Sequence, residues 1–343
     1  MFSTRKSSLG LHCSQLVLCA ALGFGWSQSA YAKATITTFD LPNSDGTVPI
    51  AIQNGVITGY YYFGPAHGFI RFPDGTTTTF DPAGSANTYA NSISGSGAVT
   101  GYFVDDQLAE HGFVRTPDGN ITTFDVPGGV STEAWWINKK GTIAGQSYNG
   151  AGDLYCGYRY HCHGFFRTSR GKIRTFDAPG SIQTWPWQIN DHGMIVGSYV
   201  DGAQAQHSFV RAKDGTITAI DPPGSTQTYA STINNKGEIA GNYNDATGEH
   251  VFVRTPDGAF TTFDLPECSY FGINQLNDKG RITGFCVDGN NVYHALLGRS
   301  DGSFKTFDVQ GSQGTFAWSI DDAGETTGWS SLDGTTHGFL RSR

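Results

Sequence analysis

Short runs in which apolar and β-branched residues alternate with polar ones recur in sets of four along most of the chain. In one set the runs are Thr228–Ile233, Glu238–Tyr243, His250–Arg254 and Phe260–Phe263. Alternation with a period of two predicts β-strands. Turn residues separate the runs, including Asn-Asn-Lys-Gly up to Gly237 and Pro-Asp-Gly up to Gly258. Each set therefore predicts four antiparallel strands, named a, b, c and d in chain order.

Two short motifs mark the repeat and fix its number. The tripeptide His-x-Phe or His-x-Leu, at the start of run c, occurs seven times, at His67, His111, His163, His207, His250, His294 and His337. An apolar residue followed by Asp, at the end of run d, also occurs seven times, at Asp40, Asp81, Asp125, Asp177, Asp221, Asp264 and Asp308. A four-stranded repeat of this length, about 44 residues, is typical of a β-propeller blade.

The ends of the repeat region complement each other. The segment 35–40 is a run d without its a, b and c, and the chain ends on a run c at 337–341. The sequence therefore predicts an all-β, seven-bladed β-propeller in which the N-terminal strand completes the last blade and closes the ring. An open solenoid is the alternative, but it would normally carry atypical capping repeats. Residues 33–343 are expected to form this single domain.

The first 32 residues differ in kind from the repeats. Arg5 and Lys6 precede an apolar stretch over 16–22, and Ala30-Tyr31-Ala32 is a small-x-small cleavage pattern. These features predict a secretory signal peptide cleaved near Ala32. The apolar stretch is short for a membrane span, and no other segment is long enough. We therefore expect a secreted or periplasmic protein without a membrane span.

The His-Gly-Phe and His-Ala-Leu tripeptides, with Ile-Asn-x-x-Gly-x-Ile-x-Gly between them, resemble the bacterial HAF-type extracellular repeat. The resemblance covers nearly all of residues 34–343 and implies a secreted, repeat-built protein. It implies no activity and no catalytic residues. Because the His and Asp recur in every unit, we interpret them structurally. The His is expected to hydrogen-bond across the blade, and the Asp to accept backbone N–H groups in the d-to-a loop.

Composition narrows the classes of partner. The chain has 22 Lys and Arg against 30 Asp and Glu, for a formal net charge of −8. This balance argues against nucleic acid or an anionic membrane as a partner. No phosphate loop, dinucleotide-binding fingerprint, nucleophile elbow or metalloprotease helix is present, so we expect no cofactor. We expect a monomer with an extracellular ligand.

The units differ most in their b–c loops, which share one face with the d–a loops. Variable loops on a rigid scaffold are common binding sites. Aromatic residues in run a are expected to surround the channel mouth on this face and to suit the stacking of sugar rings. The candidates are Tyr89, Trp135, Trp185, Trp187, Tyr229, Phe316 and Trp318. The alternative is that these rings pack between blades.

Other candidate chemistry lies in the same loops. Asp residues at 105, 106, 201, 245, 288 and 333 open b–c loops and are either calcium ligands or ordinary turn openers. We favour turn openers and expect no metal. The four remaining Cys predict two local disulfides, Cys156–Cys162 and Cys268–Cys286. A zinc site of Cys156 and Cys162 with His161 and His163 is the alternative for the first pair.

The sequence thus predicts a secreted or periplasmic binding protein whose ligand, a glycan by hypothesis, lies on the loop face at the channel mouth. An extracellular polysaccharide hydrolase or lyase is one alternative. Its candidate residues are Glu133, Asp153, His161 and His192. A structural or adhesive surface module without a small-molecule site is the other.

Overall fold

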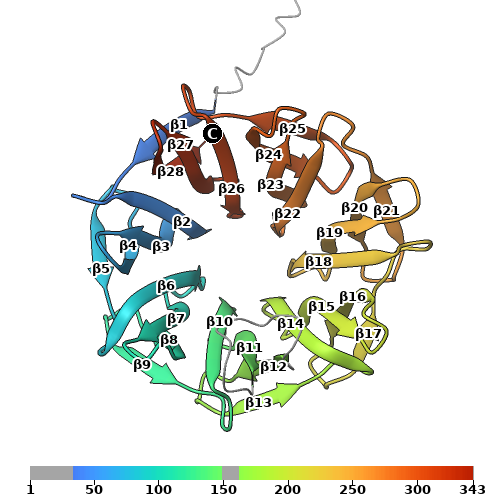
Figure 1. Ribbon diagram of the computed structural model, residues 1–343, viewed down its shortest axis with the longest axis horizontal. Helices are drawn as coiled ribbons and strands as arrows, with labels where there is room; N and C mark the ends of the chain where they lie inside the picture. Colours follow the sequence, from blue (N-terminus) through green and yellow to red (C-terminus); the bar gives the residue numbers. More distant parts are fainter. Residues whose placement is uncertain (1–33, 149–161, 343) are drawn as a thin grey trace, which may run out of the picture. The chain divides into compact units, whose positions relative to one another are not determined.

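A computed structural model describes residues 34–148 and 162–342 (Figure 1). Within these residues all regular structure is β-strand, and no helix is present, so none could span a membrane. The strands follow one another as repeated antiparallel hairpins, as the turn pattern of the sequence predicts. Figure 1 shows the sheets of the unit 34–342 with the first strand of each sheet nearest a common centre.

The strands fall into four classes by their position in the repeat. The a strands are β2 (Gly46–Gln53), β6 (Ser85–Ile93), β10 (Ser131–Ile137), β14 (Ser181–Ile189), β18 (Gln227–Ile233), β22 (Tyr270–Leu276) and β26 (Gly314–Ile320). The b strands are β3 (Val56–Tyr62), β7 (Val99–Asp105), β11 (Ile143–Tyr148), β15 (Ile195–Asp201), β19 (Ile239–Asn244), β23 (Arg281–Val287) and β27 (Thr326–Leu332). The c strands are β4 (Ala66–Arg71), β8 (Glu110–Arg115), β12 (Cys162–Arg167), β16 (Gln206–Arg211), β20 (Glu249–Arg254), β24 (Tyr293–Arg299) and β28 (Thr335–Ser342). The d strands are β1 (Thr35–Phe39), β5 (Thr77–Phe80), β9 (Ile121–Phe124), β13 (Ile173–Phe176), β17 (Ile217–Ala219), β21 (Phe260–Phe263) and β25 (Phe304–Phe307).

Within a repeat the strands pair antiparallel in the order a-b-c-d. In the last repeat the d strand comes from the other end of the chain, because β28 pairs with β1. The pairing runs from Thr35 opposite Ser342 to Phe39 opposite Gly338. The N-terminal strand thus supplies the d strand for β26–β28, as the complementary ends of the sequence predict. Single parallel bridges, between Gly46 and Thr336 and between Ser131 and Glu110, join neighbouring sheets.

Because the strand direction alternates, the connections between strands lie at the two opposite ends of each sheet's strands. We name the side with the a–b and c–d turns the turn face, and the side with the b–c and d–a loops the loop face. The turns are tight and use Gly with positive φ, for example Gly237 at 83° and Gly258 at 98°.

Every a strand contains a β-bulge. The bulge explains why the paired b strand carries the repeated Gly of the Ile-x-Gly motif. In β18 the register shifts between Ala230 and Thr232, so that Ser231 is the extra residue. The bulge brings the carbonyl oxygen of Tyr229 close to Gly241 in β19, where an added Cβ would lie only 1.9 Å from that oxygen. Any side chain at this position would therefore disrupt the a–b pairing.

The repeated apolar residues form the packing between sheets. The Phe of the His-x-Phe motif is fully buried in six units, and Leu296 takes its place in the β22–β25 sheet. In five repeats the Phe that precedes the Asp packs edge-on against the c-strand Phe of the next sheet. Phe80 and Phe113 have ring centroids 5.8 Å apart, and Phe39 and Phe69 are 6.3 Å apart. In the other two repeats Ile220 takes the place of the first Phe, and Phe263 packs against Phe304. The two motifs thus supply the two halves of most intersheet aromatic pairs.

The repeated His and Asp bind each other. Nδ1 of each His lies 2.6 to 3.0 Å from a carboxylate oxygen of the Asp fourteen residues later, as in His250–Asp264, and His337 makes the same contact with Asp40. The expected cross-strand hydrogen bond of the His is thus confirmed. The expected backbone N–H partner in the d–a loop is wrong: in the described residues the Asp carboxylate contacts the imidazole instead. Asp221 also accepts a backbone N–H, but from Ser208 in β16.

The predicted disulfide between Cys268 and Cys286 is present, with the two Cα atoms 5.3 Å apart. It joins the loop before β22 to β23 on the loop face. Cys156 lies outside the described residues, so the pairing predicted for it with Cys162 stays a prediction.

Replacing Cys268 and Cys286 together by Ala is expected to lower the free energy of unfolding by about 3 kcal/mol, the usual contribution of a disulfide that closes a loop of this size. Urea denaturation of the variant and the oxidised wild type would measure the difference. An equal midpoint for both proteins would contradict the prediction.

Candidate functional site

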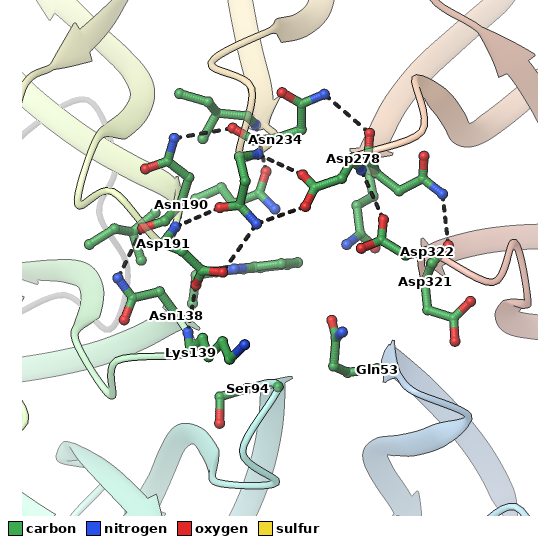
Figure 2. Close-up of a pocket in the computed structure, with 18 of the residues that line it drawn as sticks. Gln53, Ser94, Asn138, Lys139, Asn190, Asp191, Asn234, Asp278, Asp321 and Asp322 are labelled. Atoms are coloured by element: carbon green, nitrogen blue, oxygen red, sulfur yellow. Dashed lines mark hydrogen bonds between the residues drawn. The ribbon is translucent and has the colours of Figure 1, made fainter.

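A cavity of about 300 Å³ lies where the a–b turns of successive sheets converge (Figure 2). Every a strand from β2 to β26 contributes its last residues and the following turn to the lining. The cavity therefore lies on the turn face, whereas the sequence places the ligand on the loop face. The lining is mostly polar, with amide, carboxylate and ammonium groups.

The innermost polar residues are the Asn of the Ile-Asn-x-x-Gly motif. The Nδ2 group of Asn190 donates to the carbonyl oxygen of Asn234, and Asn234 donates in the same way to Asn277, both at 3.1 Å. The contact repeats from Asn138 to Asn190 and from Asn277 to Asp321 (Figure 2). Each Asn also accepts, through Oδ1, backbone N–H groups two and four residues later in its own turn. These buried amides therefore connect each of these turns to the next by hydrogen bonds, and both the amide nitrogen and the amide oxygen have partners within the protein.

The next residue of each turn forms a second, more exposed series. Oδ1 of Asp191, Asn235, Asp278 and Asp322 each accepts the backbone N–H of the corresponding residue in the preceding turn, at 2.7 to 3.0 Å. Nδ2 of Asn235 also donates to Oδ2 of Asp191 and of Asp278. Burial raises the pKa of the Asp322 carboxyl, and the hydrogen bond from the Asp278 backbone N–H opposes this rise. The negative charges of Asp278 and Asp321 raise the pKa further. Carboxylates thus dominate this side of the cavity.

The series changes character at the β2–β3 and β6–β7 turns. Gln53 and Asn54 take the two positions in the first of these turns, and Ser94 and Gly95 take them in the second (Figure 2). Neither side-chain series continues through them, and the β2–β3 turn is joined to its neighbour by the Gly55 N–H, which donates to Asp321 Oδ2. The aliphatic part of Lys139 lies over Gly95, where an added Cβ would be 3.7 Å from Lys139 Cγ. The cavity is therefore asymmetric: carboxylates line it at the turns from Asp191 to Asp322, and the β2–β3 and β6–β7 turns contribute none.

The cavity floor is formed by residues that follow the bulges. Oε1 of Gln188 accepts the backbone N–H of Ile233 at 2.6 Å, and Oε1 of Gln275 accepts that of Ile320 at 2.9 Å. The partly exposed Trp136 takes the equivalent place in β10 and also lines the cavity. An indole ring and fixed acceptor groups thus occur in one polar cavity.

Three of the predicted aromatic residues, Trp135, Trp187 and Trp318, are bulge residues of their a strands. Trp135 and Trp187 contact each other edge-on with centroids 6.1 Å apart. Trp187 is 36% exposed, and its Nε1 donates to Ser198. The indole N–H groups of Trp135 and Trp318 are buried and have no hydrogen-bond partner in the described part of the chain.

The other predicted aromatic residues lie one or more positions before the bulge. Tyr89 packs between Tyr60 of the preceding sheet and Tyr102 of its own. Phe316 is buried and stacks on Phe285 and Trp329. Trp185 and Tyr229 are partly exposed. The structure therefore brings Trp135 and Trp187 together but places Phe316 in the packing between sheets.

A buried pair of carboxyl groups joins the β6–β9 and β10–β13 sheets. Glu133 in β10 is 7% exposed, and it shares a hydrogen bond with Glu110 of β8. Burial, together with the charge and hydrogen bond of Glu110, raises the pKa of Glu133 to about 8. Gln146 Nε2 donates to Glu133 Oε2, and Ser131 Oγ donates to Glu110 Oε2. Neither carboxyl group lines the cavity, although the sequence marks Glu133 as a catalytic candidate.

The Asp residues that open b–c loops act locally. Asp105, Asp201 and Asp288 each accept backbone N–H groups two and four residues later, the geometry of turn openers. Asp245 also approaches Nε2 of His250 at 3.1 Å. Burial alone would lower the pKa of His250, but Asp264 and Asp245 together raise it. Asp106 and Asp333 are exposed, and no group of His, Cys, Asp or Glu in the described segments is arranged to hold a metal ion.

Of the remaining catalytic candidates, the structure describes one, and it does not line the cavity. Asp153 and His161 lie outside the described residues. His192 is exposed in the β14–β15 turn, next to Asp191 but not in the lining. The sequence analysis missed Asp191, Asp278, Asp322 and Lys139, because their positions read as ordinary turn residues. The available signal was that Asn or Asp follows the last apolar residue of the a strand in five of the seven repeats.

Comparisons with known proteins identify a fold. No family model matches the chain, and no curated protein sequence matches it. Among solved structures, a streptogramin B lyase aligns with a TM-score of 0.61 at 15% identity, over 90% of this chain and 97% of that one. The β-propeller domain of the Trilobed protease from Pyrococcus furiosus aligns with a TM-score of 0.60 at 8% identity, over 86% and 94%. The chain has a β-propeller-like fold. A polysaccharide lyase, Uly1, aligns with a TM-score of 0.52 at 9% identity, over 88% and 90%. Identities this low carry the fold and nothing of activity.

Proposed function

We propose that the chain is an exported, seven-bladed β-propeller of the HAF-repeat type, closed by β1. Seven copies of the His and Asp motifs and the pairing of β1 with β28 support the blade number and the closure. The N-terminal sequence pattern and the Cys268–Cys286 disulfide support export to an oxidising compartment.

The proposed function is binding of a small, polyhydroxylated ligand, such as a sugar, in the turn-face cavity. The observation that carries this proposal is the row of carboxylates at Asp191, Asp278 and Asp322. Their Oδ1 atoms are held by backbone N–H groups, which fixes each carboxylate before any ligand arrives. Oδ2 of Asp322 has no partner among the described residues and is free to accept a hydroxyl. Fixed acceptors near an indole ring suit a sugar, whose hydroxyls donate and whose apolar face stacks.

A glycan array with the wild-type protein tests this proposal, followed by calorimetry on any glycan that binds. We expect Asp322→Asn to weaken binding at least tenfold, because it turns a free acceptor into a donor at little steric cost. Asp106→Asn, on the opposite face, is the matched control and is expected to change affinity less than twofold. A wild-type protein that binds no glycan would exclude the sugar as ligand.

Glycan binding at the aromatic residues of the a strands is a separate prediction, and the same assay tests it. If Trp185→Ala and Trp187→Ala abolish glycan binding while Asp322→Asn leaves it unchanged, the glycan lies at the aromatic residues and not in the turn-face cavity. Hydrolase or lyase activity also stays a prediction. Incubating the wild type with each bound glycan and measuring new reducing ends or unsaturated products would detect it.

A further inference from the structure

Exposed apolar side chains gather on the loop face. Nine large apolar residues in the described segments are exposed, and seven of them lie in b–c or d–a loops or at the strand ends beside them. These seven are Tyr62, Phe63, Leu108, Val130, Tyr270, Tyr293 and Leu332. Of the others, Phe72 lies in a c–d turn and Trp187 in an a strand. A soluble protein that exposes apolar residues on one face commonly uses that face for binding.

The described part of the same face carries no Lys or Arg side chain. Every described Lys and Arg lies in a turn or within two residues of a turn-face strand end. Carboxylates, by contrast, are frequent in the loops. Asp106, Glu267 and Asp333 are exposed there, and no side-chain contact occupies them in the described structure. The described part of the loop face is therefore apolar and rich in carboxylates, and every described Lys and Arg lies toward the turn face.

The best-defined part of this face is an aromatic cluster at the start of β22 and β24. Tyr270 is 53% exposed and Tyr293 is 39% exposed, and both rings contact Phe285, at 5.6 and 5.7 Å between centroids. Burial and then the charge of Glu249 raise the pKa of Tyr270. Asn242 Nδ2 holds one oxygen of that carboxylate at 2.7 Å. Two exposed rings beside a fixed carboxylate fit a Lys or Arg side chain through cation–π and ionic contacts.

The neighbouring backbone fixes this cluster in place. The Cys268–Cys286 disulfide lies immediately before Tyr270, and Ser269 Oγ donates to the carbonyl oxygens of Val287 and Asp288. The Tyr270 and Tyr293 rings are thus held in place before a ligand binds, so binding does not involve the entropy cost of ordering this loop.

We propose that the loop face docks a basic polypeptide segment that carries apolar side chains, with Tyr270, Tyr293 and Glu249 receiving one of its cationic residues. Charge complementarity selects this occupant. An acidic segment would meet the like charge of the carboxylates in the described loops, and a neutral segment would form no ionic contact with them. This site lies opposite the turn-face cavity and does not depend on the proposed sugar.

Fluorescence anisotropy with three labelled synthetic peptides tests the proposal. The peptides repeat Lys-Leu-Lys-Ser, Lys-Ser-Lys-Ser or Glu-Leu-Glu-Ser. We expect the Lys-Leu peptide to bind most tightly at about 50 mM salt and to weaken at about 300 mM salt, because screening reduces ionic contacts. The Lys-Ser peptide should bind more weakly, and the Glu-Leu peptide should not bind.

Variants then locate the site. Asp106→Asn/Glu267→Gln/Asp333→Asn, and separately Tyr270→Ser/Tyr293→Ser, are each expected to weaken Lys-Leu binding about fivefold or more. Lys140→Gln/Lys236→Gln/Lys279→Gln removes three charges from the turn face and should not weaken it. Thermal denaturation verifies that each variant is folded. Equal binding by wild type and both loop-face variants, or equal binding of the Lys-Leu and Glu-Leu peptides, would overturn the proposal.

Discussion

Glu133→Gln is expected to stabilise the protein above pH 8, although it removes a hydrogen-bonded residue from a buried site. Glu133 and Glu110 share one proton between the β6–β9 and β10–β13 sheets, with Glu133 donating to the Glu110 carboxylate. When both are ionised, two negative charges face each other in a buried site, which is unfavourable. A neutral Gln can donate to Glu110 at every pH.

The expected pH dependence follows from the raised pKa of Glu133. In the unfolded chain this group ionises near the ordinary value of about 4.3, and in the folded protein at about 8. Between these values the folded state holds a proton that the unfolded state has lost, so the free energy of unfolding falls as pH rises through this window. His250, whose pKa is also raised, adds to the fall because its charged form is stabilised in the folded state.

Urea denaturation at a series of pH values from 5 to 9 would measure this effect. We expect wild type to lose stability toward pH 9 and Glu133→Gln to lose less, with a difference of about 2 kcal/mol at the upper end. Glu267→Gln, at an exposed site, is the control and should follow the wild-type curve. Parallel curves for wild type and Glu133→Gln would show that the pair does not share a proton.

Asn234→Ala is expected to lower the free energy of unfolding by about 3 kcal/mol at neutral pH, since several buried groups lose their partners. The Asn234 side chain donates to the carbonyl oxygen of Asn277 and accepts the N–H groups of Lys236 and Glu238. Alanine would leave these groups unpaired in a turn where Asn234 is only 3% exposed.

Thermal and urea denaturation of Asn234→Ala would measure the loss. Asn244→Ala provides the comparison within the same sheet, because its side chain makes one long contact, 3.4 Å, to Gln227 near the surface. We expect Asn244→Ala to change stability by less than about 0.5 kcal/mol. Equal effects of the two substitutions would mean that the amide series at the cavity does not hold the turns together.

The repeat made the strands predictable, because the same turn residues and apolar positions recur in every unit. Gly237 and Gly258 marked turns, and the segment 35–40 marked a strand whose partner lies at the other end of the chain. The bulges could not be predicted, since the sequence of Tyr229-Ala230-Ser231 reads as ordinary alternation. The bulge sets which side chain faces the centre, so the orientation of the aromatic residues could not be predicted either.

The candidate site was harder to predict for a different reason. Asp191 and Asp278 occupy positions where Asp and Asn open turns in most proteins, and one turn alone gives no hint of a site. Their significance comes from the convergence of successive turns on one cavity, which is a property of the sheets together. The link between the repeated His and Asp was likewise missed, because two structural roles were assigned separately to residues that meet, such as His250 and Asp264.

The pairing of β1 with β28 has a consequence for the order of synthesis and folding. Asp40 and His337, which meet at this pairing, are separated by 297 residues, so the first strand to be made waits for the last. Until β28 emerges, residues 35–39 have no strand partner and β27 lacks its c strand. A contact at such long range slows the final folding step and leaves strand edges available to other chains in the meantime. A nascent or truncated chain that lacks β28 should therefore be far more prone to aggregate than its completed counterpart.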